Sequence, residues 1–431
     1  MGLFCKRFEL KIYKNSVNGL NTRISGTALR FLMPLYIMAF SSESELGIFY
    51  LATALLTSAA TFIGLELGYY YSAIYLSTEA EQKKDIFNNF VIQGVRTGLF
   101  VIIVGFLSIL VWLSISTVPT YLIFSPILFA SEALSFEVGR FFWNIDEVKH
   151  ASFRDLVKSI ALVFSVVGSL YLFDTILSLF SVITLIFVNF SLLLYEINRW
   201  GDLNSALNTS FIVRSSPINS IKIFIKKLLA VSGPQFLQNQ IISFSLLAEK
   251  VIITTVIGIG FQGVYSFAYS IVQTSASLFL SPHVAETRRI IISDQPKFLN
   301  KSTYKAALRL YPIVVFFITL FGIFGYFALP ILGELLNKDP VENVLIIILV
   351  VIVSSSANTY TAAISPLYGQ QNRWLKANLV SIIILTPLIL GSFIYKYVEM
   401  DGLIFVFVLI VFSSIMQIIV RLFFLGSKRV Q

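Results

Sequence analysis

The sequence contains very little of the chemistry that metals, disulfides and nucleotides require. Cys5 is the only cysteine, and the two histidines, His150 and His283, stand far apart. A single cysteine excludes an internal disulfide, and no Cys/His cluster has a spacing that could hold a metal ion. The chain also lacks the Walker A pattern Gly-x-x-x-x-Gly-Lys-Ser/Thr, which predicts that it does not itself consume ATP. We therefore expect no resident metal or organic cofactor.

Charged residues are also scarce. They make up 13% of the chain, whereas apolar residues make up 56%; soluble domains carry about 25% charged and about 45–50% apolar residues. Such an apolar excess cannot be buried inside a water-facing globule of 431 residues, so part of the surface must face lipid. The net charge of +9 could suggest nucleic acid, but the basic residues lie in short clusters between apolar runs, as membrane topology determinants do. The composition predicts an all-α integral membrane protein with no nucleic-acid partner.

Apolar runs of about 20 residues, the length that crosses a bilayer as a helix, recur along the chain. We expect about twelve transmembrane helices. The runs lie near 22–40, 46–76, 90–112, 119–142, 154–173, 176–195, 227–257, 261–283, 303–330, 342–364, 374–396 and 401–425. The second and seventh are long enough to tilt or to continue past the bilayer. Residues 2–19 combine basic and apolar side chains at helical spacing, which predicts a retained interfacial helix.

The charges in successive connections predict the orientation. The basic residues of alternate connections are Lys83, Lys84, Lys149, Arg154, Lys158, Arg199, Arg214, Lys222, Lys226, Lys227, Arg288, Arg289, Lys297, Lys301, Lys305, Arg373, Lys376, Lys428 and Arg429. The connections between these hold at most Lys338 and Lys396, together with acidic residues. Because Lys and Arg are enriched in cytoplasmic loops, we expect both termini to be cytoplasmic.

The polar stretch 196–221 divides the runs into two sets of six. We expect two pseudo-symmetric six-helix lobes, residues 1–205 with the interfacial helix and residues 206–431, related by an axis along the membrane normal. Similar motifs open the second and eighth runs. They are Gly47-Ile48-Phe49-Tyr50-Leu51-Ala52 and Gly263-Val264-Tyr265-Ser266-Phe267-Ala268. Duplication explains them, as does chance similarity in a biased sequence.

The same segments carry a resemblance to a known family. Glu249-Lys250-Val251-Ile252-Ile253, then Gly258, then the motif from Gly263 to Tyr269 resemble the span seven–eight signature of Wzx-type polysaccharide flippases. Gly47-Ile48-Phe49-Tyr50 resembles the corresponding first-half feature, and Pro330, Gly369-Gln370 and Asn378-Leu379 resemble the family's later spans. The family usually has Asp where this chain has Glu249. Multidrug and toxin extruders belong to the same superfamily.

The resemblance implies a function and an architecture. The chain would translocate an undecaprenyl-pyrophosphate-linked oligosaccharide, an O-antigen repeat unit, from the cytoplasmic to the periplasmic leaflet of a bacterial inner membrane by alternating access. Its two lobes would form a V-shaped bundle around a cavity that opens laterally to the lipid tail. The implied partners are membrane lipids, a polysaccharide polymerase and a chain-length regulator. The glycan ends as O antigen, part of lipopolysaccharide, or as capsule or another polymer.

Charges inside membrane spans are expensive and usually face a cavity or a partner. In the first span, Arg23 and Arg30 are seven residues apart, near one helical face. A guanidinium pair suits pyrophosphate because its planar donors grip oxyanions bidentately. Arg23 is instead a topology anchor if it snorkels to the cytoplasmic interface, whereas we expect the deeper Arg30 to face the cavity. Glu66, within Gly64-Leu65-Glu66-Leu67-Gly68, either pairs with a span-one arginine or binds a coupling ion.

Further candidates lie in the fourth, seventh and eighth spans. Glu137 and Arg140 can pair because they are three residues apart, and Glu132 would extend their polar wall. Glu249 and Lys250 point about 100° apart and need separate partners. The remaining candidates for sugar binding are Gln238, Asn239, Tyr265 and Tyr269; interhelical packing explains these four equally well. Coupling to H+ or Na+ would use Glu66, Glu132 or Glu249.

Two rival functions belong to different classes. A multidrug or cation extruder shares the superfamily, but the array of arginines and Lys250 disfavours cationic substrates. A membrane polysaccharide polymerase or glycosyltransferase needs catalytic residues on a sizeable external loop. The outward connections are only about 3–12 residues long, so we expect no enzyme.

Overall fold

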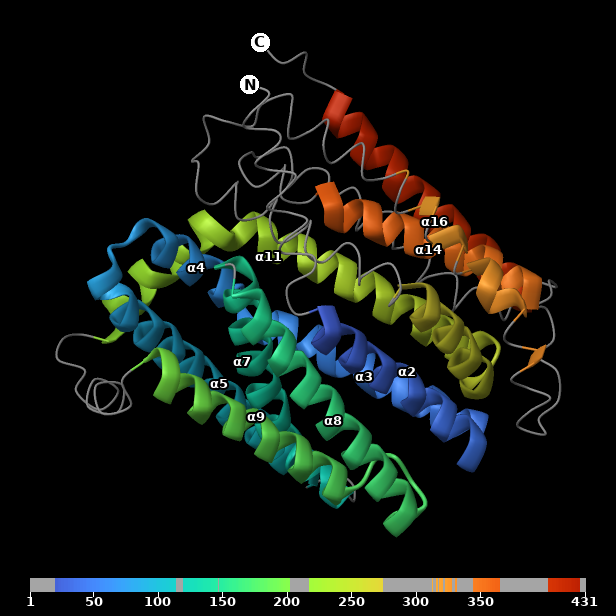
Figure 1. Ribbon diagram of the computed structural model, residues 1–431, viewed down its shortest axis with the longest axis horizontal. Helices are drawn as coiled ribbons and strands as arrows, with labels where there is room; N and C mark the ends of the chain where they lie inside the picture. The colour runs from blue at the N-terminus through green and yellow to red at the C-terminus, as the bar shows by residue number, and fades with distance from the viewer. Residues whose placement is uncertain are drawn as a thin grey trace. The chain divides into compact units, whose positions relative to one another are not determined.

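The structure is a computed structural model (Figure 1). It describes residues 20–113, 119–145, 147–201, 217–273, 344–364 and 402–426, with part of 312–331. The predicted interfacial helix 2–19, the run 374–396 and His283 lie outside the described residues.

The described residues form helices and contain no strand. The elements are α2 (Leu20–Phe40), α3 (Glu43–Gly64), α4 (Leu67–Ser77), η1 (Ala80–Gln82), α5 (Lys83–Leu113), α6 (Thr120–Ile123), α7 (Ser125–Asn144), α8 (Val148–Phe173), α9 (Leu179–Trp200), α11 (Pro217–Val256), α14 (Val344–Ile364) and α16 (Gly402–Gly426). Residues 259–273 are also helical. This content confirms the all-α prediction, and most of the predicted runs coincide with a described helix.

Five stretches of the described chain are long and apolar enough to cross a membrane. They are Glu43–Gly64, Ala80–Leu113, Val148–Phe173, Leu179–Trp200 and Gly402–Val420. Their large apolar side chains remain exposed, including Phe100, Phe187 and Phe412. Exposed apolar surface on long helices fits a lipid environment.

The predicted continuous run 46–76 is wrong in one respect. The structure breaks it at Leu65 and Glu66, which separate α3 from α4. Both residues adopt the left-handed backbone conformation, with φ of 52° and 59°. Hydropathy could not reveal the break, because the residues on both sides are apolar and the conformation depends on tertiary contacts.

The chain divides into two compact units. Of the described residues, unit 1 contains 20–30 and 56–236, and unit 2 contains 31–55 and the described residues from 237 onward. Helices α2, α3 and α11 each have residues in both units. The expected lobes at 1–205 and 206–431 stay a prediction.

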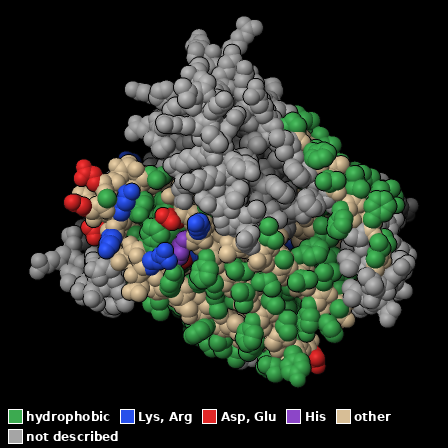
Figure 2. Space-filling model, in the orientation of Figure 1, with side chains coloured by type: hydrophobic (Ala, Val, Ile, Leu, Met, Phe, Trp, Pro, Cys, Tyr) green, Lys and Arg blue, Asp and Glu red, His purple; other side chains and the backbone are tan. Residues whose placement is uncertain are grey.

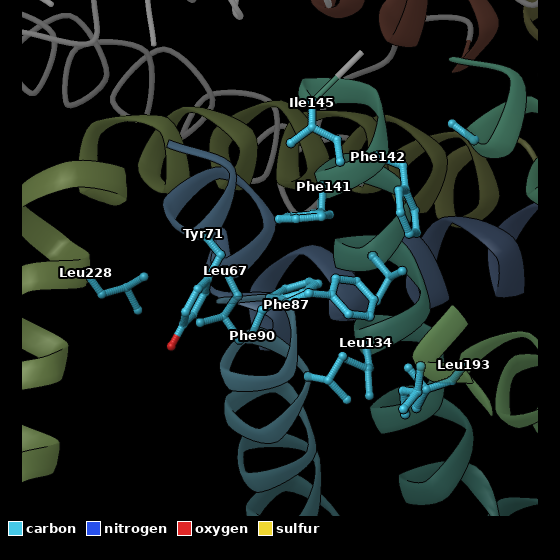
Figure 3. Close-up of a cluster of buried hydrophobic side chains, with 14 residues drawn as sticks. Leu67, Tyr71, Phe87, Phe90, Leu134, Phe141, Phe142, Ile145, Leu193 and Leu228 are labelled. Carbon is cyan, nitrogen blue, oxygen red and sulfur yellow. The ribbon is translucent and has the colours of Figure 1, made fainter. Parts of the chain in front are cut away.

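Unit 1 is built around α7, which packs against α4, α5, α8 and α9. Figure 3 shows the apolar side of this packing, a cluster of buried aromatic and aliphatic side chains. The Phe90 and Phe141 rings stack with centroids 5.1 Å apart, and Phe87 lies 5.6 Å from Phe141. Aromatic pairs at these distances add stabilisation beyond their buried area. The apolar cluster fixes α7, so the polar side chains of α7 occupy defined positions.

Unit 2 brings the two repeated sequence motifs into contact. A Cβ added to Gly263 would lie 2.7 Å from the Gly47 backbone nitrogen and 2.8 Å from the Glu43 carbonyl oxygen. A Cβ on Gly47 would overlap the carbonyl oxygen of Ile259. Only glycine allows these two backbones to approach so closely. The first residues of the two motifs therefore form one helix contact, and the interpretation of an internal duplication stays a prediction.

Charged side chains gather at one edge of the face shown in Figure 2. This edge lies over the end of α4 and the starts of α5 and α8, whereas hydrophobic side chains cover much of the remaining described surface. The described Lys83, Lys84, Lys149 and Arg199 belong to these helix ends or to the neighbouring end of α9. The positive-inside pattern predicts that this end is cytoplasmic.

Candidate functional site

The helix break places two buried carboxylates beside one guanidinium. Glu66 lies in the break, and Glu137 and Arg140 come from α7; the two glutamates are each 1% exposed. Arg140 forms an ion pair with Glu66, and its Nη1 lies 3.3 Å from Glu137 Oε1. The predicted pairing of Glu137 with Arg140 is confirmed. One guanidinium therefore holds a carboxylate from the α3–α4 break and a carboxylate from α7.

The second oxygen of Glu137 caps the start of α4. The backbone N–H of Gly68 donates to Glu137 Oε2 at 2.6 Å. The first N–H groups of a helix have no intrahelical partner and carry partial positive charge, and in a membrane each must be satisfied inside the protein. Glu137 supplies that partner to α4 from α7.

The glycines that flank Glu66 make this arrangement possible. A Cβ at Gly64 would lie 2.6 Å from Glu137 Cγ and Oε1, and one at Gly68 would overlap the Glu137 carbonyl oxygen. The prediction that these glycines permit close helix approach is confirmed. Left-handed non-glycine residues cost on the order of 1–3 kcal/mol each and persist where surrounding contacts hold them. The Glu137 and Arg140 contacts provide that restraint for Leu65 and Glu66.

Arg30 does not pair with Glu66, which corrects one of the two expectations for that acid. The Arg30 Nε donates instead to the hydroxyl of Ser159 on α8, at 2.8 Å. The expectation assumed a continuous second span, whereas the break places Glu66 against α7, where Arg140 reaches it. The Arg23 side chain lies outside the described residues.

Glu132 does not extend the wall of Glu137 and Arg140, which corrects a second expectation. It forms an ion pair with Lys158 of α8 and accepts a hydrogen bond from Asn189 Nδ2 of α9 at 2.9 Å. Glu132 lies five residues before Glu137, so α7 presents the two acids to different neighbours. Polar contacts thus tie α7 to α8 and α9 on one side and to α4 on another.

A third buried cluster was missed by the sequence analysis. Arg154 Nε lies 2.7 Å from Glu196 Oε1, and Arg154 also donates to the carbonyl oxygen of Ser135 and, at 2.6 Å, to its hydroxyl. His150 Nε2 is 3.6 Å from the same Glu196 oxygen. Arg154 and Glu196 are 2% and 0% exposed. The cluster joins α7, α8 and α9.

A sequence signal for this cluster was present. His150, Arg154 and Lys158 recur every four residues and so share one helical face. The predicted span began at 154, which assigned the three residues to a cytoplasmic connection or its border. The structure begins α8 at Val148, so they lie within the helix.

In unit 2, the neighbouring Glu249 and Lys250 contact different partners, as their spacing predicts. The Tyr265 hydroxyl donates to Glu249, and Ser354 Oγ of α14 donates to Glu249 Oε2 at 3.2 Å. Lys250 Nζ lies 5.3 Å from the centroid of the Tyr50 ring and 3.4 Å from the Tyr50 carbonyl oxygen. Glu249 is thus a buried carboxylate held by two hydroxyls.

The remaining candidates are the four residues of α11 and of the helical segment 259–273 that were predicted to bind sugar. Tyr265 is 1% exposed, so in this structure its ring packs inside unit 2 and is not available for sugar stacking. Tyr269 and Asn239 are half-buried, and the Gln238 side chain lies outside the described residues.

No family model matches the sequence, and no curated protein is similar to it in sequence. Solved structures do match the fold. A mutant of the MATE transporter VcmN from Vibrio cholerae has a TM-score of 0.65 at 13% identity, covering 97% of both chains. An outward-facing multidrug resistance MATE family transporter of the MOP superfamily also has a TM-score of 0.65 at 13% identity, covering 96% of this chain and 95% of the other.

A third structure with this fold is a MOP superfamily transporter from Pyrococcus furiosus. Its TM-score is 0.61 at 11% identity, covering 96% of both chains. It is described as having a binding pocket of reverse polarity that suggests a different function. At these identities the likeness shows the fold. The chain is therefore an all-α multi-pass membrane protein with the fold of MATE transporters, and the predicted fold class is confirmed.

Proposed function

We propose that the chain is a flippase that moves an undecaprenyl-pyrophosphate-linked oligosaccharide across a bacterial inner membrane by alternating access. The barrier to such a movement lies in the polar head, because phosphate and hydroxyl groups lose their water partners in hydrocarbon. A carrier must therefore offer polar and cationic side chains within membrane-spanning helices. The fold of MATE transporters supports a transport role for this chain.

The observation that favours an anionic substrate is the way the cations within the helices of unit 1 are paired. Arg140, Arg154 and Lys158 each form an ion pair with a glutamate. Arg30 lies within α2 and is exposed, and no carboxylate of the described residues forms an ion pair with it. A charge inside a span needs a partner or a cavity. A phosphate oxygen of the substrate meets that need.

A cation extruder is the second candidate. Its support is Glu249, a buried carboxylate that forms no ion pair with any described Lys or Arg. Such a group can bind a cationic substrate, or a coupling H+ or Na+ if the flippase is ion-driven. The likeness to a multidrug resistance transporter supports the extruder. One structure with this fold is described as having a binding pocket of reverse polarity that suggests a different function, which leaves room for the flippase.

Transport by purified protein in liposomes discriminates between the two functions. The flippase proposal predicts that undecaprenyl-pyrophosphate-linked oligosaccharide becomes accessible to a membrane-impermeant glycosidase only in liposomes that contain the protein. A lipophilic cationic dye should move no faster than in empty liposomes. The opposite pair of results would establish the cation extruder. In cells, gene deletion should reduce surface glycan without increasing drug sensitivity, and an O-antigen pathway would add a polymerase and a chain-length regulator as partners.

Replacing Arg30 by alanine is expected to reduce this transport at least about tenfold. A hydrogen bond to a charged group contributes about 1.5–3 kcal/mol, and 1.4 kcal/mol corresponds to about a tenfold change. Glycosidase accessibility in liposomes provides the measurement. Arg96→Ala is the control, since Arg96 is also an exposed arginine in a long apolar helix, α5. Equal transport by both variants would remove Arg30 from the substrate path.

Replacing Glu249 by glutamine is expected to abolish the dependence of transport on an imposed H+ or Na+ gradient. Glutamine is nearly isosteric and can still accept from Tyr265, but it cannot carry the negative charge that attracts a cation. The measurement is the transport rate with and without each gradient. Tyr265→Phe is the matched control, because it removes a hydrogen bond to Glu249 and keeps the charge. A Glu249→Gln protein that still responds fully to the gradient would exclude this residue from coupling.

A further inference from the structure

Arg30 donates a hydrogen bond to Ser159, a residue to which the proposed function assigns no role. Arg30 lies ten residues from each end of α2 (Leu20–Phe40), so its backbone is about 15 Å from either end at 1.5 Å rise per residue. A guanidinium at this depth is costly unless its donors are satisfied or face a polar ligand.

The hydroxyl of Ser159 has a fixed direction. Ser159 Oγ donates its proton to the Asp155 carbonyl oxygen at 2.7 Å and accepts from Arg30 Nε at 2.8 Å. A hydroxyl has one donor, and here the helix carbonyl receives it. The side chain is 1% exposed, so water does not compete readily for its lone pairs. Ser159 is therefore an oriented acceptor for Arg30.

The backbone brings the two side chains together at a close helix contact. Gly26 lies one turn before Arg30, and a Cβ there would be 3.4 Å from Leu156 Cα and 3.5 Å from Ser159 Oγ. These are ordinary van der Waals distances, so α2 and α8 are in direct contact at this point. Further along α2, Pro34 has no backbone N–H. It therefore cannot donate the usual helical hydrogen bond to the carbonyl oxygen of Arg30.

The contact uses one edge of the guanidinium and leaves another available. Arginine has five N–H donors in a planar fork, and Nε supplies only one of them. The two terminal nitrogens together form an end-on edge that can donate two parallel hydrogen bonds to an oxyanion. Lysine has one ammonium group and cannot bind the serine and grip an oxyanion bidentately in this way.

We propose that Ser159 is a positioning residue that holds the Arg30 guanidinium so that its two terminal nitrogens grip the pyrophosphate of the transported lipid. The proposal rests on the proposed flippase function. It assigns to Ser159 an effect on substrate binding that depends on Arg30. It also requires arginine, rather than positive charge alone, at position 30.

The test combines single and double variants in the liposome assay. Ser159→Ala should raise the half-saturating concentration of lipid-linked oligosaccharide about three- to tenfold, the range expected for one hydrogen bond. Ser165→Ala is the matched control: Ser165 is a fully buried serine of α8 that donates to the Leu162 carbonyl oxygen at 2.8 Å and forms no hydrogen bond with another of the described helices. It should leave transport unchanged.

Epistasis separates positioning from a general structural effect. In an Arg30→Ala background, adding Ser159→Ala should reduce transport no further, because Ser159 acts through Arg30. An additive reduction in the double variant would overturn the proposal. Arg30→Lys should also fail to restore wild-type half-saturation, and full restoration by lysine would equally overturn it.

Inorganic pyrophosphate provides a readout independent of flipping. It should compete with lipid-linked oligosaccharide for wild-type and Ser165→Ala protein, and severalfold less effectively for Ser159→Ala. Equal competition in all three, with normal wild-type transport, would refute the role of Ser159 and leave the flippase function intact. No transport by the wild-type protein would instead refute the proposed function.

Discussion

Replacing Arg140 by methionine is expected to lower the free energy of unfolding by about 3–5 kcal/mol, the usual effect of removing one partner from a buried ion pair. The guanidinium contacts both Glu66 and Glu137, and the variant deprives each carboxylate of this cation. Both acids are 1% exposed, so water cannot readily replace the lost partner. Methionine retains much of the side-chain length, and the expected loss is therefore mainly electrostatic.

Thermal unfolding of the detergent-purified protein measures this effect. Arg199→Met is the matched control, because Arg199 is exposed near the end of α9 and donates to the Tyr195 hydroxyl at 2.9 Å. Exposed charges of this kind contribute little to stability. Adding Glu137→Gln to Arg140→Met should restore part of the lost stability, since it removes one of the two carboxylates. Equal melting of Arg140→Met and Arg199→Met would show that the buried network does not stabilise the fold.

The second large effect is expected for Gly263→Ala. The added methyl group would lie 2.7 Å from the Gly47 nitrogen and 2.8 Å from the Glu43 oxygen, both backbone atoms that cannot move independently. Overpacking of this kind typically costs about 1–3 kcal/mol. The variant should melt at a lower temperature and transport poorly, because the segments 31–55 and 237–273 can no longer close against one another within unit 2.

The control for this substitution is another helical glycine. A Cβ at Gly98 of α5 would lie 3.5 Å from the Ala130 Cβ, an ordinary van der Waals distance. Gly98→Ala should therefore have near-normal stability and transport. If Gly263→Ala behaved like Gly98→Ala in both measurements, the close contact between the two repeated motifs would have no energetic importance.

The fold and the charges of the chain support different parts of the functional argument. The likeness to MATE transporters shows the helical architecture, but one fold can host many functions, which depend on the site. Within unit 1, glutamates neutralise three membrane cations and leave Arg30 with a hydroxyl partner. The Arg30 guanidinium, which is held by a hydroxyl rather than by a carboxylate, favours an anionic substrate in our proposal.

The sequence by itself determined that the chain is an all-α membrane protein and identified several of the charged residues within its spans. Both properties are local: about 20 consecutive apolar residues make a helix soluble in lipid wherever it packs, and Arg30, Glu66, Glu132 and Glu249 are conspicuous in such runs. The i,i+3 spacing likewise predicted the pairing of Glu137 with Arg140.

Only the tertiary structure decided which helices these charges connect. Helical spacing gives the face of a side chain but not the neighbour that covers that face. The break at Leu65 and Glu66 directs Glu66 to Arg140. The packing of α8 brings Lys158 to Glu132 and Ser159 to Arg30. These partners come from segments distant in sequence, so their pairing depends on packing that no local pattern records.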